Sequence, residues 1–185
     1  MVIRNINDLD CSEITLITPY KFNDDYYVSE VLYKNKPLTL QTPILTLTSI
    51  DDKKVYLNLD SSMIRALTRV DNSIITIMEE NSLDWFKSEF TGEQLEELYK
   101  PSTSITDNCD SIFETVKADG FRIYSKTNPD IDQATIENNA KLISLIRLKY
   151  VIFYKSDCFP MWENVCAKIK KVKLNEDIKT VNLNN

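Results

Sequence analysis

The sequence predicts a mainly β protein with inserted helices, of the α+β class. Two observations carry this prediction. Most of the chain alternates apolar and polar residues with a period of two and is rich in β-branched and aromatic side chains, as half-buried strands are. Between about residues 61 and 101 the apolar spacing becomes helical instead. We therefore expect one domain over residues 1–185, with a β-core from about 12–60 and 110–174 and a helical insertion at about 61–101.

The N-terminal part predicts a series of strands separated by turns. The strand-like segments are EITLITPY, YYVSEVLY, KPLTLQ, TPILTLTSI and KKVYLNLD. Residues 35–37 predict the turn between the second and third of these segments, and residues 51–52 predict another. We expect the tyrosines at 26–27 to pack at the start of a strand, because the acids at 24–25 beside them would repel a phosphate group.

A single helix is predicted over residues 61–80. Its apolar side chains recur along one stripe, and Asp60 or Ser61 supplies the oxygen that caps its start. The second half is rich in isoleucine, so a strand there is the alternative.

A second, shorter helix follows. Thr91 and Gln94 have the form of a capping box, and Pro101 forbids continuation of the helix. A helix of two to three turns is marginal alone and needs tertiary anchors. We expect the Trp85 and Phe86 pair to be such anchors and not a binding site, because acidic residues surround it.

The C-terminal half is again strand-like. SIFETVKA and FRIYSK predict two strands with a turn at 119–120, and TNPDIDQATIENN is a loop or one helical turn. In the long strand AKLISLIRLKYVIFYKSD, alternation places Leu148 and Tyr150 on the same face. A corner at 158–160 leads to the last strand, MWENVCAKIKKVKLN, in which we expect Trp162 to lie in the core. An amphipathic helix in this last segment is the alternative.

Composition excludes several kinds of chemistry. The chain has no histidine, which removes histidine-based catalysis, and only two glycines, which removes phosphate-binding glycine loops. The cysteines lack paired spacing and are expected to be buried, inert thiols rather than zinc ligands. They are Cys11, Cys109, Cys158 and Cys166. We therefore expect no enzyme activity, no metal and no cofactor.

Charge is distributed unevenly along the chain. The net charge is −6, yet residues 139–174 carry eight basic side chains and two acidic ones, whereas residues 71–98 carry eight acids and one lysine. This split is compatible with an anion-binding face opposite an acidic one, and solvated strand edges and helix faces are the alternative. No run of about 18 apolar residues and no signal-peptide pattern is present, so we expect no membrane partner and a reducing compartment.

The order of several short motifs carries a resemblance to a known family. KPLTLQTPILTL, VYLNLD, RVDNSI, DWF, LYKPS and FPMWENVCAKIKKV follow one another between roughly residues 30 and 174. This series resembles the single-stranded DNA-binding proteins of large nucleocytoplasmic DNA viruses, which are related to podophage single-stranded DNA-binding proteins. The resemblance implies an antiparallel OB-like barrel with a helical insertion after the third or fourth strand. The phage relatives end in an acidic tail with a terminal aromatic residue, and NEDIKTVNLNN departs from that pattern.

The resemblance also implies a role. It implies sequence-tolerant binding of single-stranded DNA in viral DNA replication, recombination or repair, at the replication site in the host cytoplasm or nucleus. Further partners to expect are viral replication proteins or virion components, and a homo-oligomer is left open. The alternative function is that of a virion structural or minor capsid protein, packaged in the virion, whose β-domain is a protein interaction module.

Single-strand binding needs cations that follow the phosphates and flat side chains that stack on bases. Three segments combine these features: a hairpin tip, the FRIYSK strand and the long strand. The candidate nucleic-acid-binding residues are Tyr33, Lys34, Lys36, Arg122, Tyr124, Lys126, Lys149 and Lys155. The alternative for the FRIYSK strand is an ordinary solvated face, and the basic run KIKKVK is more typical of a solvated sheet edge.

Overall fold

The computed structural model describes residues 2–3, 5–106 and 110–170, and within them it confirms the mainly β architecture with inserted helices. The strands are β1 (Val2–Ile3), β2 (Ile14–Leu16), β3 (Tyr20–Lys21), β4 (Tyr27–Tyr33), β5 (Lys36–Gln41), β6 (Leu45–Ile50), β7 (Lys54–Asn58), β8 (Thr103–Ile105), β9 (Ser111–Tyr124), β10 (Lys141–Phe153) and β11 (Cys158–Lys170). The helices are α1 (Ser61–Glu80), α2 (Ser82–Phe86) and α3 (Gly92–Leu98), with 3-10 turns at Ile6–Asp8, Cys11–Glu13 and Gln133–Thr135. No helix of the described residues is long and apolar enough to span a bilayer. Residues 171–174, assigned to the β-core from the sequence, lie outside the described residues.

Five strands close into a barrel. β6 pairs with β7, β7 with β9, β9 in parallel with β11, and β11 with β10. β10 then returns to β6 through the pair of Leu142 and Leu45, which completes the circuit. The expected OB-like barrel is therefore confirmed. The helices follow β7, which is the fourth strand of five or more residues in the chain and the second strand of the barrel.

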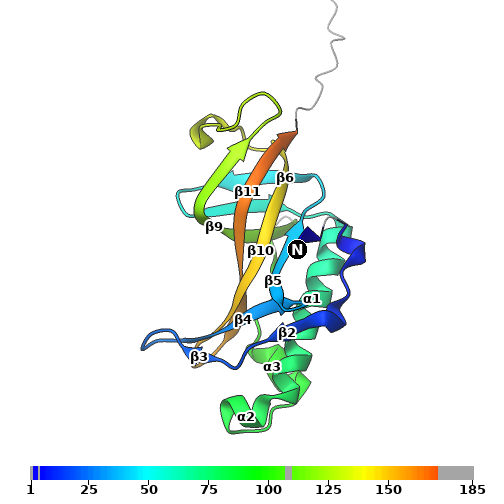
Figure 1. Cartoon of the computed structure of the whole chain (residues 1–185), viewed down its shortest axis with the longest axis vertical. Coiled ribbons are helices and arrows are strands. Elements are labelled where there is room, and N and C mark those ends of the chain that lie inside the picture. Colours follow the sequence, from blue (N-terminus) through cyan, green and yellow to red (C-terminus); the bar gives the residue numbers. More distant parts are fainter. Residues whose placement is uncertain (1, 4, 107–109, 171–185) are drawn as a thin grey trace, which may run out of the picture.

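The long strand β10 also pairs with strands that lie outside the barrel. Its residues 145–148 pair with β5 and its residues 150–153 pair with β4, so that β5 and β4 extend the barrel wall (Figure 1). Lys34 and Asn35 have φ values of 50° and 59°, which is the left-handed pair that a two-residue β4–β5 hairpin turn requires. The turn therefore lies at residues 34–35 and not at the expected residues 35–37. Pro37 belongs to β5, where it pairs with Leu32 of β4.

β9 corrects the prediction of two strands joined by a turn. It is one strand that bends at Gly120, whose φ of 73° is unfavourable for residues with a side chain. The pairing with β11 shifts at this bend, from Lys117 opposite Asn164 to Arg122 opposite Cys166. The Asp-Gly pair therefore marks a bulge that curls the strand from β7 onto β11, not a chain reversal.

Two further corrections concern β10 and β11. The reversal between them lies at residues 154–157, and Pro160 pairs within β11, so the corner at 158–160 was wrong. A bulge at Lys149 shifts the register, so Leu148 is buried against Trp162 while Tyr150 lies opposite Met161 on the outer face. Trp162 is 2% exposed, as expected for a core residue, and β11 excludes the amphipathic helix.

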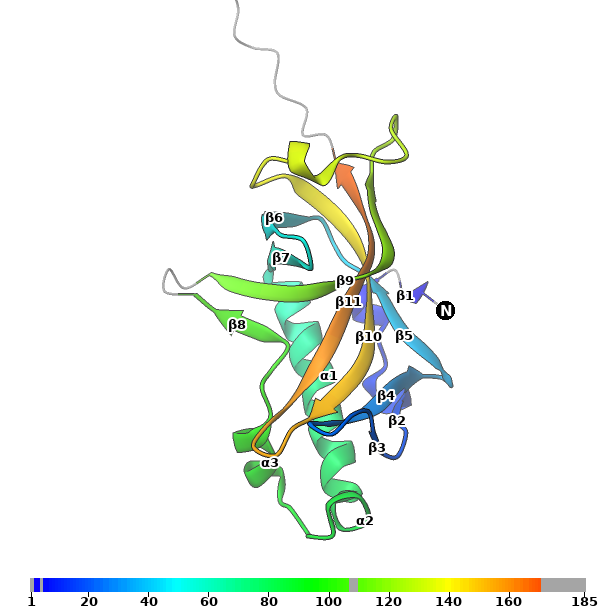
Figure 2. The same cartoon turned by 90° about the vertical axis from the view of Figure 1, so that its left-hand side faces the viewer.

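The helical insertion forms as the sequence predicts. Asp60 caps α1 by accepting a hydrogen bond from the backbone N–H of Met63, and the apolar stripe of α1 is buried alongside the long strands (Figure 2). The capping box of Thr91 and Gln94 is present at the start of α3. The short helix α2 was not predicted; it ends at Lys87, whose φ of 58° turns the chain.

A buried carboxylate joins the insertion to the barrel. Asp71 of α1 is 5% exposed and accepts hydrogen bonds from the Tyr99 hydroxyl (2.9 Å), the Ser102 N–H (2.9 Å) and the Ser102 hydroxyl (2.6 Å). The Trp162 indole N–H of β11 donates to the same hydroxyl oxygen at 2.9 Å. Burial raises the pKa of Asp71, and the hydrogen bonds from Ser102 and Tyr99 act against that rise. This chain of bonds fixes α1 to the strand opposite it.

Replacing Ser102 by alanine tests this connection. Ser102→Ala leaves the buried Trp162 N–H without its acceptor and removes a donor to Asp71, so we expect the free energy of unfolding to fall by about 1–3 kcal/mol. Urea denaturation measures the change. Ser156→Ala, at an exposed position in the β10–β11 turn, is the control and should change it by less than about 0.5 kcal/mol. Equal stability of Ser102→Ala and the unmodified protein would contradict the account.

Candidate nucleic-acid interface

The outer wall of an OB barrel and two of its loops form the usual nucleic-acid interface. Oligonucleotides bind across the face of the second and third strands, which are β7 and β9 here, and are flanked by the loop after the first strand and the loop between the fourth and fifth strands. In this barrel the fourth and fifth strands are β10 and β11, and the loop between them is residues 154–157. We therefore expect groups that bind a nucleic acid on the surface beside this loop.

Five aromatic rings cluster at this loop. The Phe22 and Tyr26 rings stack with centroids 5.3 Å apart, Tyr26 lies 5.2 Å from Tyr154, and Tyr154 stacks on Phe159 at 5.9 Å. Tyr150 joins them at 6.3 Å from Phe22. Phe22 and Tyr154 are 54% and 42% exposed. We call Phe22, Tyr26, Tyr150, Tyr154 and Phe159 the aromatic platform.

Local structure holds these rings in place. The Phe22 N–H donates to the Tyr26 carbonyl at 3.1 Å, and the Asn23 side chain accepts from the backbone N–H groups of Asp25 and Tyr26, which closes a tight turn. On the other side, the bulge at Lys149 directs Tyr150 outward. The Tyr154 N–H donates to the Asp157 carbonyl at 2.8 Å, so hydrogen bonds close both turns that carry the platform.

Cations lie next to the platform but are paired. Lys149 Nζ lies 5.4 Å from the Tyr150 ring centre and 2.7 Å from Glu163, and Arg147 also binds the Glu163 carboxylate. Burial alone would raise the pKa of Glu163, but hydrogen bonds from Lys149 and Arg147 outweigh it and lower that pKa. One carboxylate therefore partly neutralises two cations on the outer face.

The hairpin-tip candidates are placed away from this surface. Tyr33 is 5% exposed and paired with Ile14 of β2, so its ring is not available to stack on a base; this part of the prediction is corrected by burial. Lys34 lies 3.7 Å from Glu13, and Lys36 is exposed at the start of β5.

The candidates on β9 lie on the same outer wall as Lys149. Arg122 is exposed opposite Cys166, and Tyr124 is paired with Lys168 of β11. Burial raises the pKa of Tyr124, and Cys166 beside it adds to that rise. We call the group of Arg122, Tyr124 and Lys168 the basic end of the wall.

The candidate residues do not form one compact cluster. Lys126 follows the end of β9, whereas Lys155 lies in the β10–β11 turn at the opposite end of these strands (Figure 1). From Phe159 to Lys168 the strand spans about 30 Å at roughly 3.3 Å per residue. The structure therefore brings Arg122, Tyr124 and Lys149 together on one wall, as predicted, but places Lys126 and Lys155 at opposite ends of it.

Sequence reasoning missed the whole aromatic platform. Tyr26 was expected to pack in a strand, because the acids beside it were weighed as repelling phosphate. In the structure Asp24 forms an ion pair with Lys21 at 2.6 Å, and Tyr27, expected to pack, is 51% exposed. The density of aromatic residues in YKFNDDYY and KYVIFYK was the available signal.

Trp85 and Phe86 pack as the sequence predicts. Both are partly buried against the core, and Phe86 contacts Phe153 of β10 with ring centres 5.7 Å apart. The pair therefore anchors the insertion, although it also lines a pocket beside the β10–β11 turn.

The thiols differ in their surroundings. Cys158 is 4% exposed, and burial, together with the nearby Asp157, raises its pKa to about 12. Cys11 and Cys166 are half-buried, and Cys109 lies outside the described residues. The expectation of buried, inert thiols therefore fits Cys158 best.

Comparison with known proteins finds likeness only at the level of the fold. No protein-family model and no curated protein matches the sequence. Three structures of a single-stranded DNA-binding protein from bacteriophage Enc34 are similar to this chain. A C-terminal truncation gives a TM-score of 0.50 at 10% identity, covering 85% of this chain and 96% of that one. The longer form gives 0.47 over 90% and 96%, and its complex with single-stranded DNA gives 0.45 over 84% and 96%, both at 10% identity. The truncated form thus supports the OB-type fold.

Proposed function

We propose that this chain binds single-stranded DNA in a sequence-tolerant way, without catalysis, along the outer wall of β10 and β11. The aromatic platform is the observation that carries the proposal. It places partly exposed, mutually stacked rings at the loop where OB barrels meet oligonucleotides. Stacking of one base on an aromatic side chain contributes about 1–3 kcal/mol and works for every base.

The basic end extends the proposed path. Bases stack at the platform, while Arg147 and Lys149 in the middle and Arg122 at the far end hold phosphates. At the roughly 3.4 Å per nucleotide of a duplex strand, a path of about 30 Å covers about nine nucleotides, within the range of about 4–16 that one OB barrel covers.

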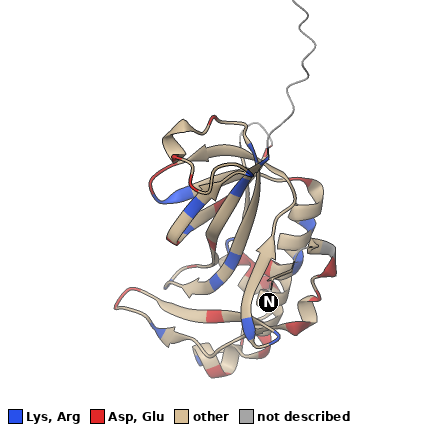
Figure 3. Ribbon diagram, turned by 45° about the horizontal axis from the view of Figure 1, so that its top comes forward, with Lys and Arg blue, Asp and Glu red and all other residues tan. Residues whose placement is uncertain are grey.

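The acidic net charge is compatible with this function. Lys and Arg recur along the long strands, whereas Asp and Glu are concentrated in helices and connecting loops (Figure 3). The net charge of −6 therefore does not describe the field at the outer wall.

The biological setting that we propose is viral DNA replication, recombination or repair. It rests on the ordered motifs between residues 30 and 174, such as LYKPS and FPMWENVCAKIKKV. The similarity to a phage DNA-binding fold agrees with this setting.

Two neighbouring tyrosines test the platform. Tyr26 belongs to the platform, and Tyr27 lines a different surface, so the two residues form a matched pair. We expect Tyr26→Ala to weaken binding of labelled oligo-dT about tenfold, through loss of one stack, and Tyr27→Ala to leave it unchanged. Fluorescence anisotropy measures both, and thermal unfolding checks that each variant is folded. Equal affinities of the two variants would count against the platform.

The shared carboxylate gives a second test. Glu163→Gln releases Lys149 and Arg147 for phosphates, so we expect tighter binding of oligo-dT and a salt dependence steeper by about 0.7 in the log-log slope for each cation released. Glu13→Gln, which releases Lys34 at the β4–β5 hairpin, is the control and should have no effect. A gain in affinity from Glu13→Gln alone would instead favour the hairpin tip as the binding site.

A further inference from the structure

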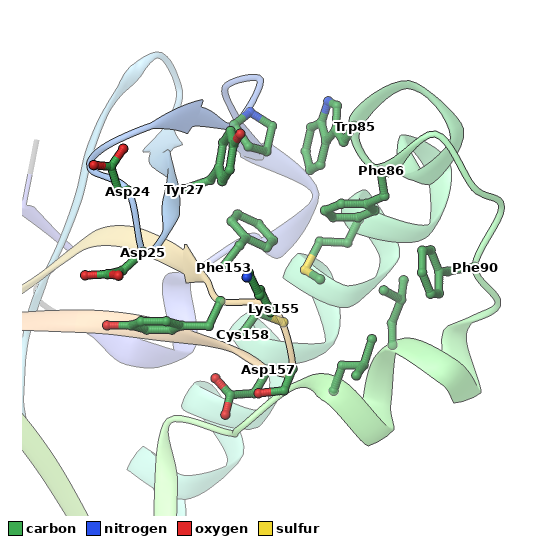
Figure 4. A pocket seen from close by; sticks show the side chains of 16 residues that line it. Asp24, Asp25, Tyr27, Trp85, Phe86, Phe90, Phe153, Lys155, Asp157 and Cys158 are labelled. Carbon is green, nitrogen blue, oxygen red and sulfur yellow. The ribbon is translucent and has the colours of Figure 1, made fainter.

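A pocket of about 440 Å³ lies between the helical insertion and the β10–β11 turn (Figure 4). One wall comes from α2, α3 and the segment between them, and the other comes from the end of β10, the turn after it and the loop before β4. Pockets for small ligands start at about 300 Å³, so this one has room for one or two side chains of a partner.

The interior of the pocket is apolar. The Phe86 ring contacts Phe90 at 5.8 Å and Phe153 at 5.7 Å, and Trp85 stands edge-on to Phe86 at 6.2 Å. Cys158 also lines it as a neutral thiol, because its pKa is raised to about 12. An aromatic or leucine side chain would gain most by entering such a cavity.

The lining also carries a surplus of acid. Three carboxylates lie in it, those of Asp24, Asp25 and Asp157, against the single cation of Lys155 (Figure 4). Asp24 is 97% exposed at its side chain and pairs with Lys21, and Asp157 pairs with Lys100. Surface ion pairs of this kind contribute little, so a partner's lysine or arginine can take the place of Lys21 or Lys100; the lining thus offers three carboxylates to a cationic segment and one lysine to a phosphate.

We propose that this pocket docks a short segment of a partner protein in which an aromatic or leucine side chain is flanked by lysine or arginine. The apolar side chain fills the cavity between Phe86 and Phe153, and the flanking cations meet the carboxylates. The proposal does not depend on DNA binding, because Tyr154 is the one residue of the pocket lining that belongs to the aromatic platform.

The pocket and the aromatic platform are nevertheless adjacent. Tyr154 lines the pocket and also lies 5.2 Å from Tyr26 of the platform. A partner held in the pocket would therefore sit beside the proposed DNA path.

Trp85 provides a direct readout of occupancy. It lines the pocket and is partly exposed, whereas Trp162, the other tryptophan, is 2% exposed in the core. We would titrate the full chain with the peptide Ac-Lys-Phe-Lys-NH2 and follow tryptophan fluorescence. The comparison ligands are Ac-Glu-Phe-Glu-NH2, Ac-Lys-Ser-Lys-NH2 and deoxythymidine monophosphate.

We expect a saturable response at millimolar concentration or below with Ac-Lys-Phe-Lys-NH2 alone. The double variant Asp24→Asn/Asp25→Asn should weaken this binding about fivefold or more through loss of two charge pairs. The matched control Asp52→Asn/Asp130→Asn removes two exposed acids elsewhere and should change nothing. The proposal is overturned by no response to Ac-Lys-Phe-Lys-NH2, by an equal response to the acidic peptide or the nucleotide, or by equal binding to both double variants.

Discussion

The hydrogen-bond chain from Asp71 through Ser102 to Trp162 is the constraint on which the rest of the structure depends. The short helices of the insertion are not stable by themselves, since α2 and α3 have five and seven residues and helices of that length are marginal alone. A buried carboxylate that accepts three hydrogen bonds is costly to expose or to leave unpaired, so it allows one arrangement of α1 against β11. That arrangement in turn sets the position of Phe86 against Phe153.

The two candidate surfaces arise where regular structure is interrupted. The bulge at Lys149 reverses the alternation of β10 and turns Tyr150 outward, and the tight turn at Asn23 brings Phe22 back over Tyr26. The same end of the molecule carries two surfaces of different character. One is aromatic with cations nearby, and the other is an apolar pocket with a surplus of acid; Tyr154 belongs to both. Their charges suit different ligands, which is why we assign them separate roles.

The sequence predicts the elements better than the surfaces. The cap at Asp60 and the capping box at Thr91 are local signals, so α1 and α3 could be predicted from single segments. In contrast, whether a side chain is buried and whether a strand bends or reverses depend on strands that are distant in the chain. Gly120 produces a bulge because β11 continues to pair on both sides of it, and Tyr33 is buried because β2 covers it. The platform joins residues 22–26 to residues 150–159, and no spacing within either segment shows that they meet.

We place single-stranded DNA on the aromatic platform and the outer wall of β10 and β11. Ultraviolet crosslinking of oligo-dT to the protein, followed by mapping of the crosslinked peptides, tests this placement most directly, because the rings that stack on bases are the groups expected to crosslink. We expect crosslinks in the peptides that contain Phe22, Tyr26, Tyr150 and Tyr154. Crosslinks confined to the β4–β5 hairpin or to the helices would contradict this placement.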